Sequence, residues 1–198
     1  MNIKHTLESA LGQNSGLRLN DIDIDADRIR AIMINEIVPE DETQDFYGKS
    51  GEQYLSTAIA LFQNASLPVT TIQDVLDLGI YLTNAVKTPK FTYTVEKSKM
   101  EESLAWLEKE ISLFPNVKVI MLMGDVAKKM FNQIAKKQMK KNVIPSGATY
   151  KIRKTPFYLG DKRIIPSYII TGGNILIEKS KCRMIEEDIA VMYDILKG

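Results

Sequence analysis

Polar side chains that can hold a ligand follow three apolar segments of the sequence. Asn35 and Glu36 end the first segment, Asn84 ends the second, and Thr171 ends the last. An amide donates and accepts hydrogen bonds, and a carboxylate can orient a water molecule or stabilise a positive charge. Such residues at the ends of buried strands are typical of a ligand site in an α/β protein. The alternative interpretation is a set of ordinary strand-to-helix loops.

The apolar segments before these residues are predicted to be strands of one sheet. They lie near residues 31–35, 80–86, 117–123 and 167–171, and helical patterns separate them, most clearly over residues 98–114. Strands that are apolar on both faces and alternate with helices indicate a parallel sheet covered on both sides. We therefore predict a three-layer α/β/α sandwich with a central, mainly parallel four-stranded sheet, whose carboxyl edge gathers the polar residues.

The other segments complete a single predicted domain over residues 1–198. Residues 1–29 are expected to form a helical and extended lead-in to the first strand. Residues 150–159 and 162–165 are predicted to be the two arms of a β-hairpin, because a Gly-Asp turn lies between them.

The composition is that of an ordinary globular protein. Hydrophobic residues make up 44% of the 198 residues and charged residues 26%. No apolar run is long enough to cross a bilayer, and the N-terminal residues lack the apolar core of a signal peptide. We therefore expect a cytoplasmic protein without a membrane partner. The net charge is only +1, so a nucleic-acid partner would need a local basic patch.

Cysteine and histidine are too scarce for several kinds of site. Cys182 is the only cysteine, which excludes an internal disulfide and a metal site built from cysteines. His5 is the only histidine and lies far from the polar strand ends, which argues against a zinc site or a Ser-His-Asp triad. We expect neither a metal nor a cofactor.

The order and spacing of several motifs resemble the uracil-DNA glycosylase superfamily over about residues 30–196. The branch concerned is bacterial and archaeal and normally carries an iron–sulfur cluster. The family's motifs Gly-Glu-Ala-Pro-Gly, Pro-Phe-Val-Gly-x-Ala-Gly, Thr-Asn-x-x-Lys, Trp-Leu-x-x-Glu-Ile and Thr-x-His-Pro-Ser correspond in order to residues 35–40, 45–51, 83–87, 106–111 and 171–175.

The resemblance implies a role for each matching residue. Phe46 would stack on a base that has flipped out of the DNA double helix, and Tyr47 is the alternative residue for this stacking. Asn84 would read the edge of uracil through its amide. Glu36 would orient the attacking water or stabilise the positively charged sugar, and Asn35 takes this role if the register is shifted by one residue.

The last motif departs from the family. Its histidine, which donates to the departing base, is missing. Thr171, Gly172 and Gly173 would line the base pocket there, and Asn174 would supply a neutral donor. Loss of one preorganised donor costs on the order of a hundred- to thousandfold in rate. The cluster cysteines are also absent, so an iron–sulfur centre cannot form.

The resemblance also implies contacts with DNA phosphates. Lys87 and Lys90 follow the second strand, and Lys179, Lys181 and Arg183 follow the last one. The lysines of residues 128–141 alternate around a helix and are interpreted as a solvated face. The expected partner is DNA that contains uracil or another deaminated base, bound by a monomer.

Two functions follow, with a third less favoured. The first is a glycosylase that hydrolyses the N-glycosidic bond of uracil or a related base in DNA. The second is a catalytically weak or inactive descendant that binds a nucleobase, a nucleotide, DNA or a protein. The third, an unrelated nucleotide-binding α/β protein, requires a glycine-rich loop after the first strand, and residues 35–42 contain no glycine.

Overall fold

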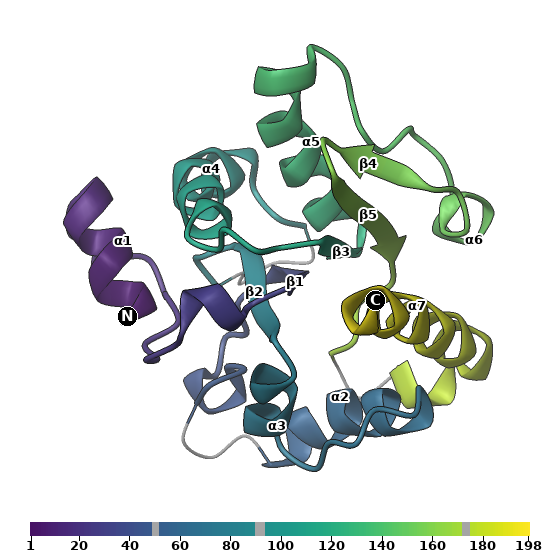
Figure 1. The fold of residues 1–198 in the computed structure, drawn as a ribbon. Helices are drawn as coiled ribbons and strands as arrows, with labels where there is room; N and C mark the ends of the chain where they lie inside the picture. Colours follow the sequence, from purple (N-terminus) through teal and green to yellow (C-terminus); the bar gives the residue numbers. More distant parts are fainter. Residues whose placement is uncertain (49–51, 90–93, 172–174) are drawn as a thin grey trace.

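A five-stranded sheet forms the centre of the fold (Figure 1), in the order β2-β1-β3-β5-β4. The computed structural model describes residues 1–48, 52–89, 94–171 and 175–198. The strands are β1 (Ala31–Ile37), β2 (Ile80–Val86), β3 (Val119–Met123), β4 (Phe157–Leu159) and β5 (Lys162–Ser167). Strands β2, β1, β3 and β5 are parallel, and β4 is antiparallel to β5. The predicted sheet is confirmed, with a short fifth strand added at one edge.

Helices cover both faces of this sheet. On one face lie α1 (Ile3–Leu11), α4 (Lys97–Ser112) and α5 (Asp125–Met139). On the other lie α2 (Glu52–Asn64), α3 (Ile72–Asp77) and α7 (Lys179–Lys197), and the four-residue α6 (Thr149–Ile152) packs beside β5. No helix in the described part of the chain is both long and apolar enough to cross a membrane.

Two hydrophobic cores result from the alternation of side chains along each strand. In β1, Ile32 and Ile34 belong to the core under α4 and α5, whereas Ala31 and Met33 belong to the core under α2 and α7. All four side chains are inaccessible to solvent. Because successive side chains of a strand point to opposite faces, a strand buried on both sides must be apolar throughout. This requirement explains the uninterrupted apolar runs in the sequence.

The predicted hairpin is only partly correct. Its turn at Gly160, where φ is +62°, and its short arms β4 and β5 are present. Residues 149–152, however, form α6, and Pro156 separates this helix from β4 because proline lacks an N–H group. The strand predicted over residues 167–171 does not form, since β5 is both the second arm of the hairpin and the fourth parallel strand.

The lead-in and one loop protect the outer edge of β2. The Asn20 side chain donates hydrogen bonds to the Tyr81 hydroxyl at 2.6 Å and to the Leu82 carbonyl at 3.1 Å. The Tyr47 hydroxyl accepts a hydrogen bond from the Leu82 N–H at 2.9 Å. Side chains therefore satisfy backbone groups that an exposed edge strand would offer to another chain.

A buried charge network attaches α7 to the sheet. The Asp188 carboxylate accepts hydrogen bonds from the Ser167 hydroxyl at 2.6 Å and from Arg153 Nε at 3.2 Å, and Arg153 also donates to the Met184 carbonyl. Burial raises the pKa of Asp188 to about 6, although the bonds from Ser167 and Arg153 act in the opposite direction. This helix begins beside the polar strand ends, so the network also fixes one wall of that region.

The raised pKa of Asp188 predicts a pH-dependent stability. The folded state keeps the proton up to about pH 6, whereas the unfolded chain loses it near the ordinary value of 3.8. The folded state thus binds more protons between these values, and its stability must fall as pH rises through this window. We expect the unfolding free energy of the wild type, relative to Asp188→Asn, to decrease between pH 4 and pH 6.5 by on the order of 2 kcal/mol. Urea unfolding at several pH values measures this, and a constant difference would contradict it.

Candidate functional site

A chain of polar side chains joins three segments that are distant in sequence. Asn35 and Asn84 lie directly opposite each other near the carboxyl ends of the neighbouring parallel strands β1 and β2. Asn35 Nδ2 donates to Asn84 Oδ1 at 3.4 Å and to the Thr171 hydroxyl at 3.0 Å. The exposed fraction is 2% for Asn35 and 4% for Asn84. The structure thus brings together three of the residues predicted for the site.

Two hydrogen-bonding groups of Asn35 and Asn84 have no partner among the described residues. Asn35 Oδ1 is buried and has no hydrogen-bond partner among the described residues. Asn84 uses its carbonyl oxygen toward Asn35, and its Nδ2 donates to no residue in the described part of the chain. A buried acceptor without a partner costs about 1–3 kcal/mol, so such atoms are rare unless a ligand or water completes them. The pair therefore offers one acceptor and one amide donor to a ligand.

Glu36 points to the opposite face of β1 and is held by α5. Its Oε1 atom accepts a hydrogen bond from the Val126 N–H at 3.0 Å, in the first turn of that helix. A carboxylate is favoured there by the unsatisfied N–H groups and the helix dipole. Gly124, with φ of +101°, leaves room for the carboxylate, since a Cβ atom at this position would collide with it. Glu36 is thus fixed by residues about ninety positions later in the chain.

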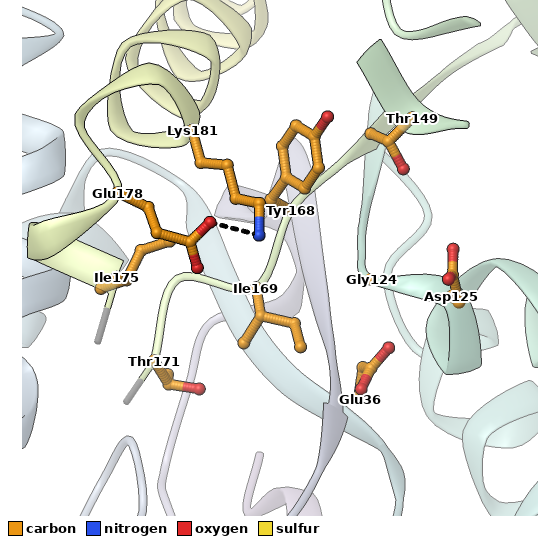
Figure 2. A pocket seen from close by; sticks show the side chains of 10 residues that line it. All are labelled: Glu36, Gly124, Asp125, Thr149, Tyr168, Ile169, Thr171, Ile175, Glu178 and Lys181. Carbon is orange, nitrogen blue, oxygen red and sulfur yellow. Dashed lines mark ion pairs between the residues drawn. The ribbon is translucent and has the colours of Figure 1, made fainter. Parts of the chain in front are cut away.

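A pocket of about 490 Å³ opens beside Glu36. Figure 2 shows Glu36 and Asp125 on one side of it and the ion pair between Glu178 and Lys181, at 2.5 Å, on the other. Thr171 also lines the pocket, so the hydroxyl that binds Asn35 connects the two asparagines with the space in front of Glu36. The complete lining comprises Glu36, Gly124, Asp125, Thr149, Tyr168, Ile169, Thr171, Ile175, Glu178 and Lys181.

Phe46 and Tyr47, the two residues predicted to stack on a base, are packed into the hydrophobic core. Phe46 is 2% exposed and belongs to the same core as Met33 and Leu82, on the sheet face that also carries Asn35 and Asn84. Stacking of a base on Phe46 stays a prediction, and it would require one face of the ring to open. Tyr47 stacks on Tyr81 with ring centroids 5.9 Å apart, so one of its faces is occupied. Burial raises the pKa of Tyr47, which keeps its hydroxyl neutral.

The prediction that Lys87 contacts a phosphate is wrong in this structure. Its side chain is 2% exposed, and its ammonium forms an ion pair with Glu110 and donates to the Thr83 hydroxyl at 2.7 Å. The Glu110 carboxylate also accepts hydrogen bonds from Tyr81 at 2.6 Å and from Thr83 at 2.9 Å. Lys87 therefore neutralises a buried carboxylate behind β2, where DNA cannot reach it.

The other residues predicted to contact DNA are either exposed on α7, in the pocket lining or outside the described residues. Lys179 and Arg183 are exposed on α7, and Lys181 lines the pocket. Their phosphate contacts stay predictions. Lys90, Gly172, Gly173 and Asn174 lie outside the described residues.

Sequence reasoning missed Glu110 and most of the pocket lining. Glu110 lies on the buried side of α4 with Ser103 and Leu107, at helical spacing. A charged residue on an otherwise buried helix face indicates a buried partner, and this signal could have identified the pair with Lys87. Tyr168 and Glu178 gave no comparable signal, because only the packing of α7 places them at the pocket.

Comparison with known proteins points to the same region. The family model described as the uracil DNA glycosylase superfamily matches residues 29–174, which include both asparagines, Glu36 and Thr171. No curated protein matches the chain.

The buried ion pair between Lys87 and Glu110 predicts that a substitution at Lys87 destabilises the fold. Lys87→Met leaves the Glu110 charge uncompensated and should lower the unfolding free energy by about 3–5 kcal/mol. The double variant Lys87→Met, Glu110→Gln removes that charge and should recover part of the loss. Urea unfolding checks both values. Unchanged stability of the Lys87→Met protein would contradict this structural role.

Proposed function

The chain belongs to the uracil DNA glycosylase superfamily, and from this premise we propose that it excises uracil, or a related deaminated base, from DNA. The observation that carries the proposal is the buried chain Asn35–Asn84–Thr171 next to a pocket with a carboxylate at Glu36. Excision requires the base to leave the stack and enter a pocket, where its edge is read by hydrogen bonds. DNA repair is the process that this activity serves.

Asn84 is proposed to recognise the base. Uracil presents a carbonyl acceptor next to an N–H donor, and an amide side chain is complementary to both. Asn84 has amide hydrogens that no described residue accepts, and its exposed fraction of 4% means that it acts in a site largely closed to water. Asn35 orients this amide through its hydrogen bond to Oδ1. A base that enters the site would complete the hydrogen bonds of both side chains.

Glu36 is proposed to act on the sugar side of the scissile bond. As the bond to the base breaks, positive charge develops on the deoxyribose and a water molecule must attack it. A carboxylate held in place by the Val126 N–H needs little reorganisation to stabilise that charge or to orient the water. Asn35 remains the alternative for this role, because its Oδ1 acceptor has no partner among the described residues.

A second candidate function is binding without efficient catalysis. Two observations favour it: the Thr-x-His-Pro-Ser histidine is replaced, and Phe46 is buried rather than presented to the pocket. Asn174 is proposed to supply the missing hydrogen bond to the departing base, as a neutral donor. A chain that lacks this compensation would still bind a nucleobase, a nucleotide, DNA or a protein partner through the same polar residues.

A single-turnover excision assay tests the proposal. The substrates are end-labelled single-stranded and duplex DNA containing uracil, hypoxanthine or xanthine, and alkali reveals the abasic sites. We expect excision by the wild type and a loss of about a hundred- to thousandfold in Asn84→Ala and Glu36→Gln, since each removes a preorganised polar group. Asn84→Asp keeps the size of the side chain but loses its donors, so it should be similarly impaired.

Matched controls come from exposed residues of the same types. Glu40 lies in the loop after β1, and Asn64 lies at the end of α2. Glu40→Gln and Asn64→Ala should retain the wild-type rate. Circular dichroism must show that every variant is folded. Absence of excision by folded wild type on all substrates would overturn the glycosylase proposal, and wild-type rates in the Asn84 and Glu36 variants would overturn the site.

A further inference from the structure

A continuous part of the sequence carries most of the unbalanced positive charge. Between Asp125 and Asp161 there are nine Lys and Arg residues and no Asp or Glu, in a chain whose net charge is +1. The rest of the chain is therefore net negative. This basic segment includes α5 and α6, leads into β4 at one edge of the sheet (Figure 1), and contributes Thr149 to the pocket.

The lysines of α5 do not all contribute to an open surface. Lys128 is 7% exposed and binds Asp125 and the Thr149 hydroxyl, and Lys137 forms an ion pair with Glu108 on α4. The positive charge near the pocket comes instead from residues after this helix. In the part of the chain that the structure describes, no carboxylate lies within ion-pair distance of Lys151 or Arg163, whereas the Lys154 ammonium lies 3.8 Å from the Glu187 carboxylate on a side chain that is 79% exposed.

Two exposed tyrosines lie next to these cations. Tyr150 is 59% exposed and Tyr158 is 51% exposed, so neither ring serves the hydrophobic core. The Lys151 ammonium lies 5.6 Å from the centre of the Tyr150 ring, and the Arg163 guanidinium lies 5.5 Å from that of Tyr158. Each cation lies over its ring, and the exposed fractions show that about half of each tyrosine is accessible to a ligand. Arg163 lies directly opposite Tyr158 in the β4–β5 ladder, which fixes this pair.

We propose that the surface formed by Tyr150, Lys151, Lys154, Tyr158 and Arg163, called here the α6–β4 surface, binds a single-stranded segment of DNA that continues from the pocket. Exposed aromatic rings next to cations match the alternation of bases and phosphates in a single strand. Bases of a duplex are stacked on one another and cannot use the tyrosines. Thr149, the neighbour of Tyr150, lines the pocket, so a strand bound there extends directly onto this surface.

This inference deepens the proposed function and rests on it only for the identity of the ligand as DNA. It adds a preference for single-stranded over duplex substrate, and it assigns that preference to residues outside the catalytic pocket. Occupation of the α6–β4 surface does not require a damaged base. Binding of undamaged single strands and excision are therefore separable measurements.

The test compares binding of a labelled, undamaged single strand of twenty nucleotides with binding of its duplex, by fluorescence anisotropy over a range of salt concentrations. We expect tighter binding of the single strand. Tyr150→Ala and Tyr158→Ala should each weaken it about five- to hundredfold, the range for loss of one base–aromatic stack. Lys151→Gln and Lys154→Gln should each make the dependence of log affinity on log salt shallower by about 0.7, because each variant neutralises one phosphate fewer.

Lys197→Gln is the control at a second lysine–tyrosine pair. Its ammonium lies 4.8 Å from the centre of the Tyr193 ring, but it also forms an ion pair with Asp194 and lies at the far end of α7. This variant should bind single strands like the wild type. The side chains of Tyr150, Lys151, Lys154 and Tyr158 are on the surface, so their substitution should leave the thermal unfolding temperature nearly unchanged. A loss of binding in these variants therefore reports on the interaction with DNA.

The possible outcomes distinguish the two proposals. Loss of single-strand binding in the tyrosine variants supports the α6–β4 surface, whether or not the protein excises a base. Equal affinity for duplex and single strand, or wild-type binding by all four variants, overturns the α6–β4 surface even if excision occurs.

Discussion

The position of β1 between β2 and β3 is the constraint on which the rest of the structure depends. This strand is hydrogen-bonded on both edges and buried on both faces, so its register cannot shift without moving apolar side chains into the wrong core. The fixed register sets Asn35 opposite Asn84 and sends Glu36 to the other face. Asn35 and Glu36 are therefore adjacent in sequence but meet different partners, because successive side chains of a strand point to opposite faces of the sheet.

Buried polar groups on the two faces of β2 have different roles. Behind the strand, Lys87, Glu110, Thr83 and Tyr81 satisfy one another, and such a closed network stabilises a unique packing. On the other face of the sheet, Asn35 in the neighbouring strand β1 retains an acceptor without a partner among the described residues. The contrast between a completed network and an incomplete one separates structural polar residues from those that await a ligand. Lys87, in a family-like motif, belongs to the completed network in the core.

Charge is divided between the two sides of the proposed site. Glu36, Asp125 and Glu178 line the pocket, and the last two are paired with Lys128 and Lys181, whereas the α6–β4 surface is basic and aromatic. The Glu36 carboxylate suits a reaction that develops positive charge on a sugar. A basic surface beside it suits the phosphates of the strand that carries the sugar. A net charge close to zero therefore conceals a local basic surface, and the whole-chain value says little about the partner.

The sequence by itself determined the layered architecture, because periodicity and continuous apolar runs report on local conformation and two-sided burial. It also identified Asn35, Asn84 and Thr171 as polar residues that meet at one edge of the sheet, although Thr171 follows β5 in a loop and does not end a strand. Only the tertiary structure decided that Lys87 is buried, that residues 149–152 form a helix, and that Glu36 is held by the start of α5. These outcomes depend on partners far away in sequence, such as Glu110, Asp188 and Val126. A side chain's spacing along the chain predicts which face it occupies, but the neighbour that it meets there is fixed only when the layers pack.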